Sequence, residues 1–142
     1  MKARVIVGTF ILLLIAIVAA ALTPVNYESR EALYEIPHGT WAQRMSGDLV
    51  DILPERIYLA LGVRDTLVLK NLDEVPQMFG PTLIMPGQSF TLPFNLATEH
   101  QFACTAHVSG QMTVVVDPEP TLGWPRFQWR VKKMLRMFIA PG

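Results

Sequence analysis

The chain opens with a long apolar run that contains no charged side chain. Residues 5–22 read VIVGTFILLLIAIVAAAL, in which only Gly8 and Thr9 depart from apolar character. As a helix this stretch would be about 27 Å long, which is close to the thickness of the hydrocarbon core of a bilayer. We therefore predict that residues 1–22 form one transmembrane helix that anchors the protein.

The charges on either side of this run predict how the helix is oriented. Lys2 and Arg4 precede it, and the first charge after it is Glu28. Because basic flanks stay in the cytoplasm, we expect a single-pass protein with a cytoplasmic N-terminus and a domain on the extracytoplasmic face, periplasmic or outer. A cleaved signal peptide is the alternative, since Ala19 and Ala21 have the spacing of a signal-peptidase site. Both interpretations export the domain.

The middle of the chain carries short runs of branched and aromatic residues separated by turn-forming residues. After a mixed connector at residues 23–36, the loop signals Pro37 and Gly39 mark the start of a domain that we place at residues 37–118. Runs of this length at spacings of about 8 to 12 residues, with no helical pattern between them, predict an all-β fold, an antiparallel β-sandwich. The predicted strands are residues 56–61, 66–71, 77–79, 83–85, 89–92, 100–104 and 111–116.

The last part of the chain, residues 119–142, changes to helical periodicity. Apolar and basic residues fall on different stripes of a helix, so we predict an amphipathic C-terminal helix. A basic amphipathic helix either lies on anionic lipid or docks on an acidic partner, and the alternative is a helix that covers the domain's own core. The residues assigned to a membrane or partner surface are Trp124, Phe127, Arg130, Val131, Lys133, Leu135 and Phe138.

Composition then narrows the classes of function. The formal net charge is zero and charged residues make up 17% of the chain, so no overall positive field favours a nucleic-acid partner. Cys104 is the only cysteine, which excludes a disulfide framework within the chain. The sequence also lacks the motifs of serine hydrolases, phosphate-binding loops and zinc proteases, so we predict no enzyme activity. The carboxylates of Asp73 and Glu74 lie in a predicted turn, where exposure to solvent is expected.

Three residues near the end of the predicted domain have the spacing of a metal-binding loop. Cys104 is followed by His107 and Met112, and upstream Asn71 ends a predicted strand before a Pro-Gly turn. Over residues 68–116 this pattern resembles the cupredoxins, the family of blue copper proteins. The resemblance implies a Greek-key sandwich in which Cys104 supplies a thiolate, His107 an imidazole and Met112 a weak axial thioether to copper.

The first histidine of the family pattern is absent, because Gln77 occupies its position. An amide oxygen is a poor equatorial donor for copper, so we expect a degenerate site and no cofactor, with copper as the open alternative. His38 lies in a loop of unknown place, and about 13 Å of strand would separate His100 from Cys104. Met78 would complete a sulfur-rich set that prefers Cu(I), but strand alternation turns it away if Gln77 faces the site.

These features lead to one predicted function and two alternatives. The chain is predicted to be a membrane-anchored accessory subunit of an electron-transfer or energy-converting complex, with a degenerate copper site and with other subunits of that complex as partners. The first alternative is an anchored blue-copper electron carrier that uses Cys104, His107 and Met112 and exchanges electrons through a solvent-near edge of His107. The second alternative is delivery of Cu(I).

Overall fold

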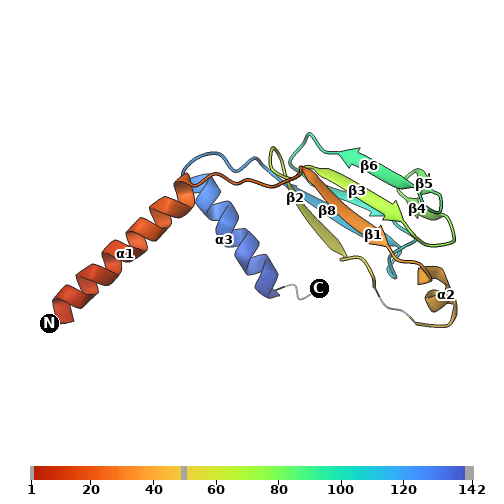
Figure 1. The fold of residues 1–142 in the computed structure, drawn as a ribbon, viewed down its shortest axis with the longest axis horizontal. Helices are drawn as coiled ribbons and strands as arrows, with labels where there is room; N and C mark the ends of the chain where they lie inside the picture. The colour runs from red at the N-terminus through yellow and green to blue at the C-terminus, as the bar shows by residue number, and fades with distance from the viewer. Residues whose placement is uncertain (1, 49–50, 140–142) are drawn as a thin grey trace. The chain divides into compact units, whose positions relative to one another are not determined.

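The computed structural model describes residues 2–48 and 51–139, which fall into two units. Residues 27–119 form a unit of β-strands that also contains the short helix α2 (Thr40–Met45). The described residues before and after it form a helical unit with α1 (Lys2–Leu22) and α3 (Trp124–Ile139) (Figure 1).

Two three-stranded sheets make up the β unit (Figure 1). In the first sheet, β3 (Thr66–Asn71) lies between β1 (Glu31–Ile36) and β6 (Ser89–Pro93). In the second, β8 (Gln111–Asp117) lies between β2 (Arg56–Ala60) and β7 (Glu99–Ala103). The central strand of each sheet pairs in parallel with one neighbour, β1 or β2, and antiparallel with the other. A separate hairpin joins β4 (Gln77–Phe79) to β5 (Thr82–Ile84).

The inner faces of the two sheets share one hydrophobic core, so the unit is a β-sandwich. Alternate residues of β3 and β8, such as Leu67 with Leu69 and Val114 with Val116, are buried because successive side chains of a strand point to opposite faces. Burying a large aliphatic side chain contributes about 1.5–3 kcal/mol to the free energy of folding. The larger core residues include Ile36, Ile57, Leu59, Leu67, Leu69, Phe79, Ile84 and Val114.

The predicted strands are confirmed, with ends that shift by one residue at most, but their pairing is not purely antiparallel. β2 and β3, which follow each other closely in the chain, belong to different sheets. The connection between them turns at Gly62, whose φ of 71° suits glycine, and the Asp65 carboxylate accepts the Gly62 N–H at 3.0 Å. This tight link carries the chain from one sheet to the other instead of forming a hairpin.

The segment predicted as a connector, residues 23–36, contains the strand β1. Ala32 and Ile36 face the core, whereas Leu33 on the opposite face is exposed. The strand was missed because two glutamates, at positions 31 and 35, make this stretch look like a polar linker. The helix α2 follows β1 and was likewise not predicted, since six residues are too few for a helical period to be recognised.

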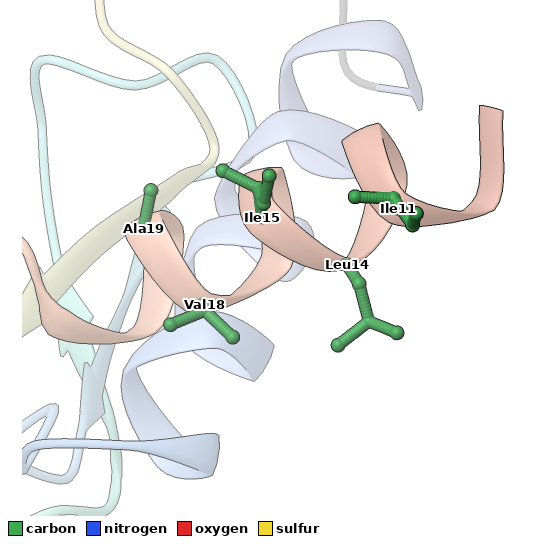
Figure 2. Close-up of a pocket in the computed structure, with 5 residues that line it drawn as sticks. All are labelled: Ile11, Leu14, Ile15, Val18 and Ala19. Atoms are coloured by element: carbon green, nitrogen blue, oxygen red, sulfur yellow. The ribbon is translucent and has the colours of Figure 1, made fainter. Parts of the chain in front are cut away.

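In the helical unit, both terminal helices of the prediction are present as α1 and α3. No described residue of α3 is buried. A predicted feature of α1 is not found: within the described part of the chain, no helix is long and apolar enough to cross a membrane. Five apolar side chains of α1 line a surface pocket (Figure 2), namely Ile11, Leu14, Ile15, Val18 and Ala19.

Candidate functional site

The four positions that match copper ligands lie on β4, β8 and the loop after β7. Gln77 begins β4 and Met112 lies on β8. Cys104 directly follows β7, and His107 lies in the loop between β7 and β8. A β-bridge pairs Phe79 with Cys104 and joins β4 to this loop. All four positions are buried; even His107 is only 4% exposed.

The side-chain amide of Gln77 is bonded at both ends. Its Oε1 accepts a 2.8 Å hydrogen bond from the hydroxyl of Thr105, and its Nε2 lies 3.4 Å from Asp73 Oδ2. Thr105 is itself fixed, because its hydroxyl and its N–H bond the backbone of Met78 at 2.8 and 3.0 Å. Gln77 therefore ties β4 to the Cys104 loop and serves there as a structural hydrogen-bonding residue.

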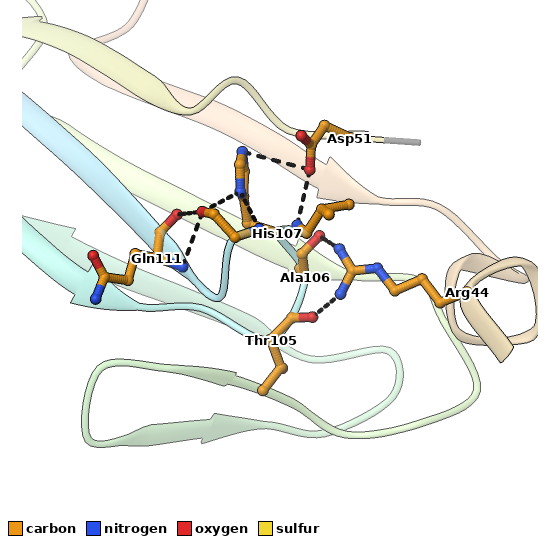
Figure 3. A network of polar contacts seen from close by, with 8 residues as sticks. Arg44, Asp51, Thr105, Ala106, His107 and Gln111 are labelled. Carbon is orange, nitrogen blue, oxygen red and sulfur yellow. Dashed lines mark hydrogen bonds and ion pairs between the residues drawn. The ribbon is translucent and has the colours of Figure 1, made fainter. Parts of the chain in front are cut away.

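His107 is held by groups outside the predicted ligand set. Its Nδ1 lies 2.8 Å from Ser109 Oγ and accepts the Ser109 N–H at 3.2 Å. Because a backbone N–H donates to Nδ1, that nitrogen carries the lone pair and the proton of the neutral ring sits on Nε2. The Nε2 atom lies 3.6 Å from Asp51 Oδ1, which also accepts the N–H of Val108 at 2.8 Å (Figure 3).

The burial of His107 overturns one detail of the electron-carrier alternative. That alternative needs an imidazole edge near solvent, but the imidazole is enclosed. Its enclosure follows from the loop geometry, because the bonds to Ser109 and the proximity of Asp51 hold the ring against the sandwich. His107 thus lies at the end of the core with Nδ1 bonded to Ser109, whereas its buried Nε2 atom has no hydrogen-bond partner among the described residues.

The Cys104 thiol is buried and its pKa is raised above the ordinary value. Burial is the main cause, while the N–H groups of Ala106 and His107 and the charge of Arg44 act in the opposite direction. Metals bind the thiolate, so a raised pKa works against ligation. The Cys104 N–H bonds the carbonyl of Gly110 at 2.9 Å, which closes the loop upon itself.

Helix α2 covers this loop through Arg44, a residue that the sequence analysis did not single out. The Arg44 guanidinium donates to the backbone carbonyls of Thr105 and Ala106, between Cys104 and His107 (Figure 3). Hydrogen bonds from a charged donor are roughly twice as strong as neutral ones. Arg44 therefore clamps the loop that carries the candidate ligands.

Asp73 positions α2 for this contact and is not the exposed turn residue that the sequence predicts. It is buried, and its carboxylate accepts the N–H groups of Gly39 and Trp41 at 3.0 and 2.9 Å. It thereby caps the start of α2, which has no cap from a side chain of its own. A cap supplied from more than thirty residues away leaves no local sequence signal.

The substitute ligands considered from the sequence lie away from the site. His100 packs against Phe94 with a ring separation of 5.0 Å, and His38 is exposed, with Nε2 3.4 Å from Glu74 Oε1. Met78 points outward and is 42% exposed, as the alternation of β4 requires when Gln77 points inward. The sulfur-rich set is therefore not assembled.

As arranged, the residues of the site do not fit copper. The amide of Gln77 and the Nδ1 atom of His107 are bonded to neighbouring protein groups, which leaves the Nε2 atom of His107, a thiol whose pKa is raised and one thioether. Among the described residues, no three His, Cys, Asp or Glu side chains are grouped so that they could hold a metal ion. A blue copper site needs two imidazoles in addition to the thiolate.

Solved structures with some similarity to this chain are cupredoxins. A novel purple cupredoxin from Nitrosopumilus maritimus is 19% identical, with a TM-score of 0.41 over 61% of this chain and 99% of that one. A proline-to-alanine mutant of amicyanin in the oxidized state is 16% identical, with a TM-score of 0.43 over 61% and 82%. A methionine-to-alanine mutant of amicyanin with Cu(I) is also 16% identical, with a TM-score of 0.44 over 64% and 86%.

No family model matches the chain, and no curated protein matches it. With every TM-score below 0.5, these similarities carry no argument about what the protein does. The all-β sandwich is established by its own sheets and core.

Proposed function

We propose that the chain is a cupredoxin-like docking module, an accessory subunit of a membrane electron-transfer or energy-converting complex, whose copper site has become part of the scaffold. The observation that carries this proposal is the bonding of the Gln77 amide to Thr105 and Asp73. Gln77, at the position where a copper protein of this family would have a histidine ligand, here joins two segments of the sandwich. The site end therefore works as a rigid support.

The elements that meet at this end present apolar side chains to solvent, which supports a role in docking. Arg44 and Asp73 tie α2 to the two loops of the site. Exposed apolar side chains on segments tied together in this way are typical of protein–protein contact surfaces. We call the following set the docking surface: Trp41, Met45, Leu72, Met78 and Val108.

The docking surface is testable by substitution. Trp41→Ala with Met45→Ala should reduce the amount of complex that co-purifies from detergent-solubilised native membranes, because aromatic anchors dominate contact energies. Leu33→Ala with Leu96→Ala is the matched control, since both residues are exposed on other parts of the sandwich. Equal recovery of partner subunits with both double variants would remove the docking surface from the proposal.

We also propose that α1 attaches the protein to a membrane, with the sandwich on the extracytoplasmic side. In support, residues 5–22 carry no charge, the basic residues Lys2 and Arg4 precede them, and the large side chains of α1 from Ile6 to Ile15 are exposed. Such a surface is costly in water, at about 25 cal/mol for each Å² of apolar area. Resistance to extraction by alkaline carbonate would support attachment, and release into the soluble fraction would refute it.

Copper binding separates this proposal from the electron-carrier alternative, which the spacing and common burial of Cys104, His107 and Met112 favour. We expect the full chain in detergent, loaded with Cu(II), to bind less than one copper per chain after dialysis. It should show no intense visible band from thiolate-to-copper charge transfer. One retained copper per chain together with that band would establish the electron carrier and overturn the accessory role.

A further inference from the structure

Helix α3 and its flanks are strongly and uniformly cationic. From residue 120 to residue 142 the chain has five basic residues and no acidic one, although its formal net charge is zero. Lys132, Lys133 and Arg136 belong to the second half of the helix, and Lys133 Nζ lies 5.5 Å above the ring of Trp129. The segment therefore carries a local positive field that the overall charge conceals.

The other face of α3 is apolar and only partly covered, since Phe127 and Val131 are half-buried whereas Leu135 and Phe138 are exposed. Residues spaced three and four apart, such as Phe127, Val131 and Leu135, share one side of the helix. Exposure rises toward the C-terminal end, where Phe138 and Ile139 are each 78% exposed. None of the described residues of α3 is buried. The C-terminal part of this apolar face is therefore open to solvent.

The start of α3 is fixed to the end of α1 within the helical unit. Arg130 Nη2 donates to the carbonyls of Thr23 and Pro24 at 2.9 and 3.3 Å, and Arg126 Nη1 donates to the Thr23 carbonyl at 3.2 Å. The N–H of Gly123 bonds the carbonyl of Ala21 at 3.2 Å. The last carbonyls of a helix lack partners within it and carry partial negative charge, so two guanidinium groups are suited to this position.

We infer that α3 binds the surface of an anionic phospholipid bilayer and lies along it, with the apolar face toward the acyl chains and the basic face among the headgroups. Basic residues on one side of a helix and aromatic residues on the other are the pattern of interfacial helices. The hydrogen bonds to the end of α1 set α3 beside the helix proposed to attach the protein to the membrane. The inference rests on the proposed membrane location, and it does not depend on copper.

Tryptophan quenching tests this inference in the full chain. The protein has three tryptophans, and Trp41→Phe leaves Trp124 and Trp129, both on α3, as the only reporters. This variant is reconstituted with vesicles of phosphatidylcholine alone or with 30% phosphatidylglycerol, each containing lipids brominated on the acyl chains. We expect quenching at least about twofold stronger in the anionic vesicles, and a return to the neutral level at high salt because screening weakens the attraction.

A second quenching experiment uses variants of the basic residues of α3. A basic residue near an anionic surface contributes about 1 kcal/mol, so changing Lys132, Lys133 and Arg136 to glutamine should weaken binding of α3 by about a hundredfold. The control keeps the charge, with Lys132→Arg and Lys133→Arg, and should quench as the parent does. Quenching that is equal in both vesicle types, or unchanged by the triple variant, would overturn the inference and leave an acidic protein surface as the occupant.

Flotation of the same samples separates failure of this inference from failure of the proposed membrane attachment. Flotation with both vesicle types but equal quenching would uphold α1 as an anchor and overturn the role of α3. Flotation with anionic vesicles only, lost in the triple variant, would uphold α3 and refute insertion of α1. Flotation with neither would overturn both.

Discussion

The side-chain oxygen of Gln77 accepts a 2.8 Å hydrogen bond from the hydroxyl of Thr105, which lies next to Cys104 in the chain. The same hydroxyl accepts the backbone N–H of Met78 at 2.8 Å, so one oxygen joins β4 to the loop after β7. A histidine at position 77 would offer an imidazole donor where this contact now lies. The residue at the predicted position of a histidine ligand is therefore also one that holds the loop.

The first prediction concerns restoration of a ligand at this position. Gln77→His should raise the affinity for Cu(II) by at least about tenfold, because imidazole is a far better equatorial donor than an amide oxygen. Adding Ser109→Ala should raise it further, since Ser109 no longer offers a hydroxyl to His107 Nδ1. Competition with a chelator measures the affinities, and Gln77→Leu, which has no donor, is the control. If Gln77→His and Gln77→Leu bind Cu(II) with equal affinity, position 77 does not face a copper site.

The second prediction concerns the clamp that Arg44 places on the loop. Arg44→Ala leaves the carbonyls of Thr105 and Ala106 without their charged donor, and bonds of this type contribute about 1.5–3 kcal/mol each. We expect a lower midpoint of thermal unfolding and faster reaction of the Cys104 thiol with a disulfide reagent. Arg56→Ala is the control, because its ion pair with Glu99 is exposed and should contribute at most about 1 kcal/mol. Unchanged thiol reactivity would show that Arg44 does not close the loop.

The strands of the sandwich were predictable because each has a local signature. Alternation of buried and exposed residues marks β8, and turn residues bound β3 closely enough that its predicted and observed ends agree. Sheet membership has no such signature. The parallel partner of β3 is β1, which begins thirty-five positions earlier, and no pattern inside either strand encodes that pairing.

The candidate site was likewise only partly predictable from local sequence. Cys104, His107 and Met112 could be proposed from the sequence because the three residues share one loop and the strand that follows it, with a spacing that resembles the cupredoxin pattern. The groups that decide their chemistry come from elsewhere: Arg44 and Asp51 lie about sixty residues before their contacts. Their roles arise only when α2 and the segment after it fold over the loop, so the sequence could not predict them.

The third prediction concerns Asn71, which is fully buried at the end of β3. Its Nδ2 donates to the carbonyls of Val75 and Ile84 at 2.8 and 2.9 Å, and its Oδ1 accepts the Asp73 N–H at 3.0 Å. Asn71→Ala leaves three backbone groups, two buried and one partly buried, without their hydrogen-bond partner, and each costs about 1–3 kcal/mol. We expect a loss of at least about 3 kcal/mol in the free energy of unfolding, measured in urea.

A matched substitution makes the Asn71 result interpretable. Leu72→Ala changes the next residue, which is exposed, and should cost less than about 1 kcal/mol. If Asn71→Ala and Leu72→Ala unfold at the same urea concentration, the buried amide does not support the loop. The accounting of its three hydrogen bonds would then be wrong.

The last prediction concerns the ion pair between Arg30 and Asp65, which joins the chain before β1 to the start of β3. The hydrogen bond from Arg30 holds the pKa of the Asp65 carboxyl below its ordinary value of 3.8, against the opposing effect of burial. A carboxyl whose pKa is lower in the folded protein binds a proton more readily after unfolding. Its stabilising effect is therefore complete well above pH 3.8 and is lost as the pH falls through the lowered value.

Asp65→Asn tests this pH dependence directly. The variant should be less stable than the parent near neutral pH, and the difference in the free energy of unfolding should shrink as the pH is lowered below about 4. Urea unfolding at a series of pH values measures the difference, with Glu99→Gln as a control that removes an exposed carboxylate paired with Arg56. A difference for Asp65→Asn that stays constant down to the acid limit would show that the substitution acts through lost packing. The pair with Arg30 would then have no electrostatic role in holding β1 against β3.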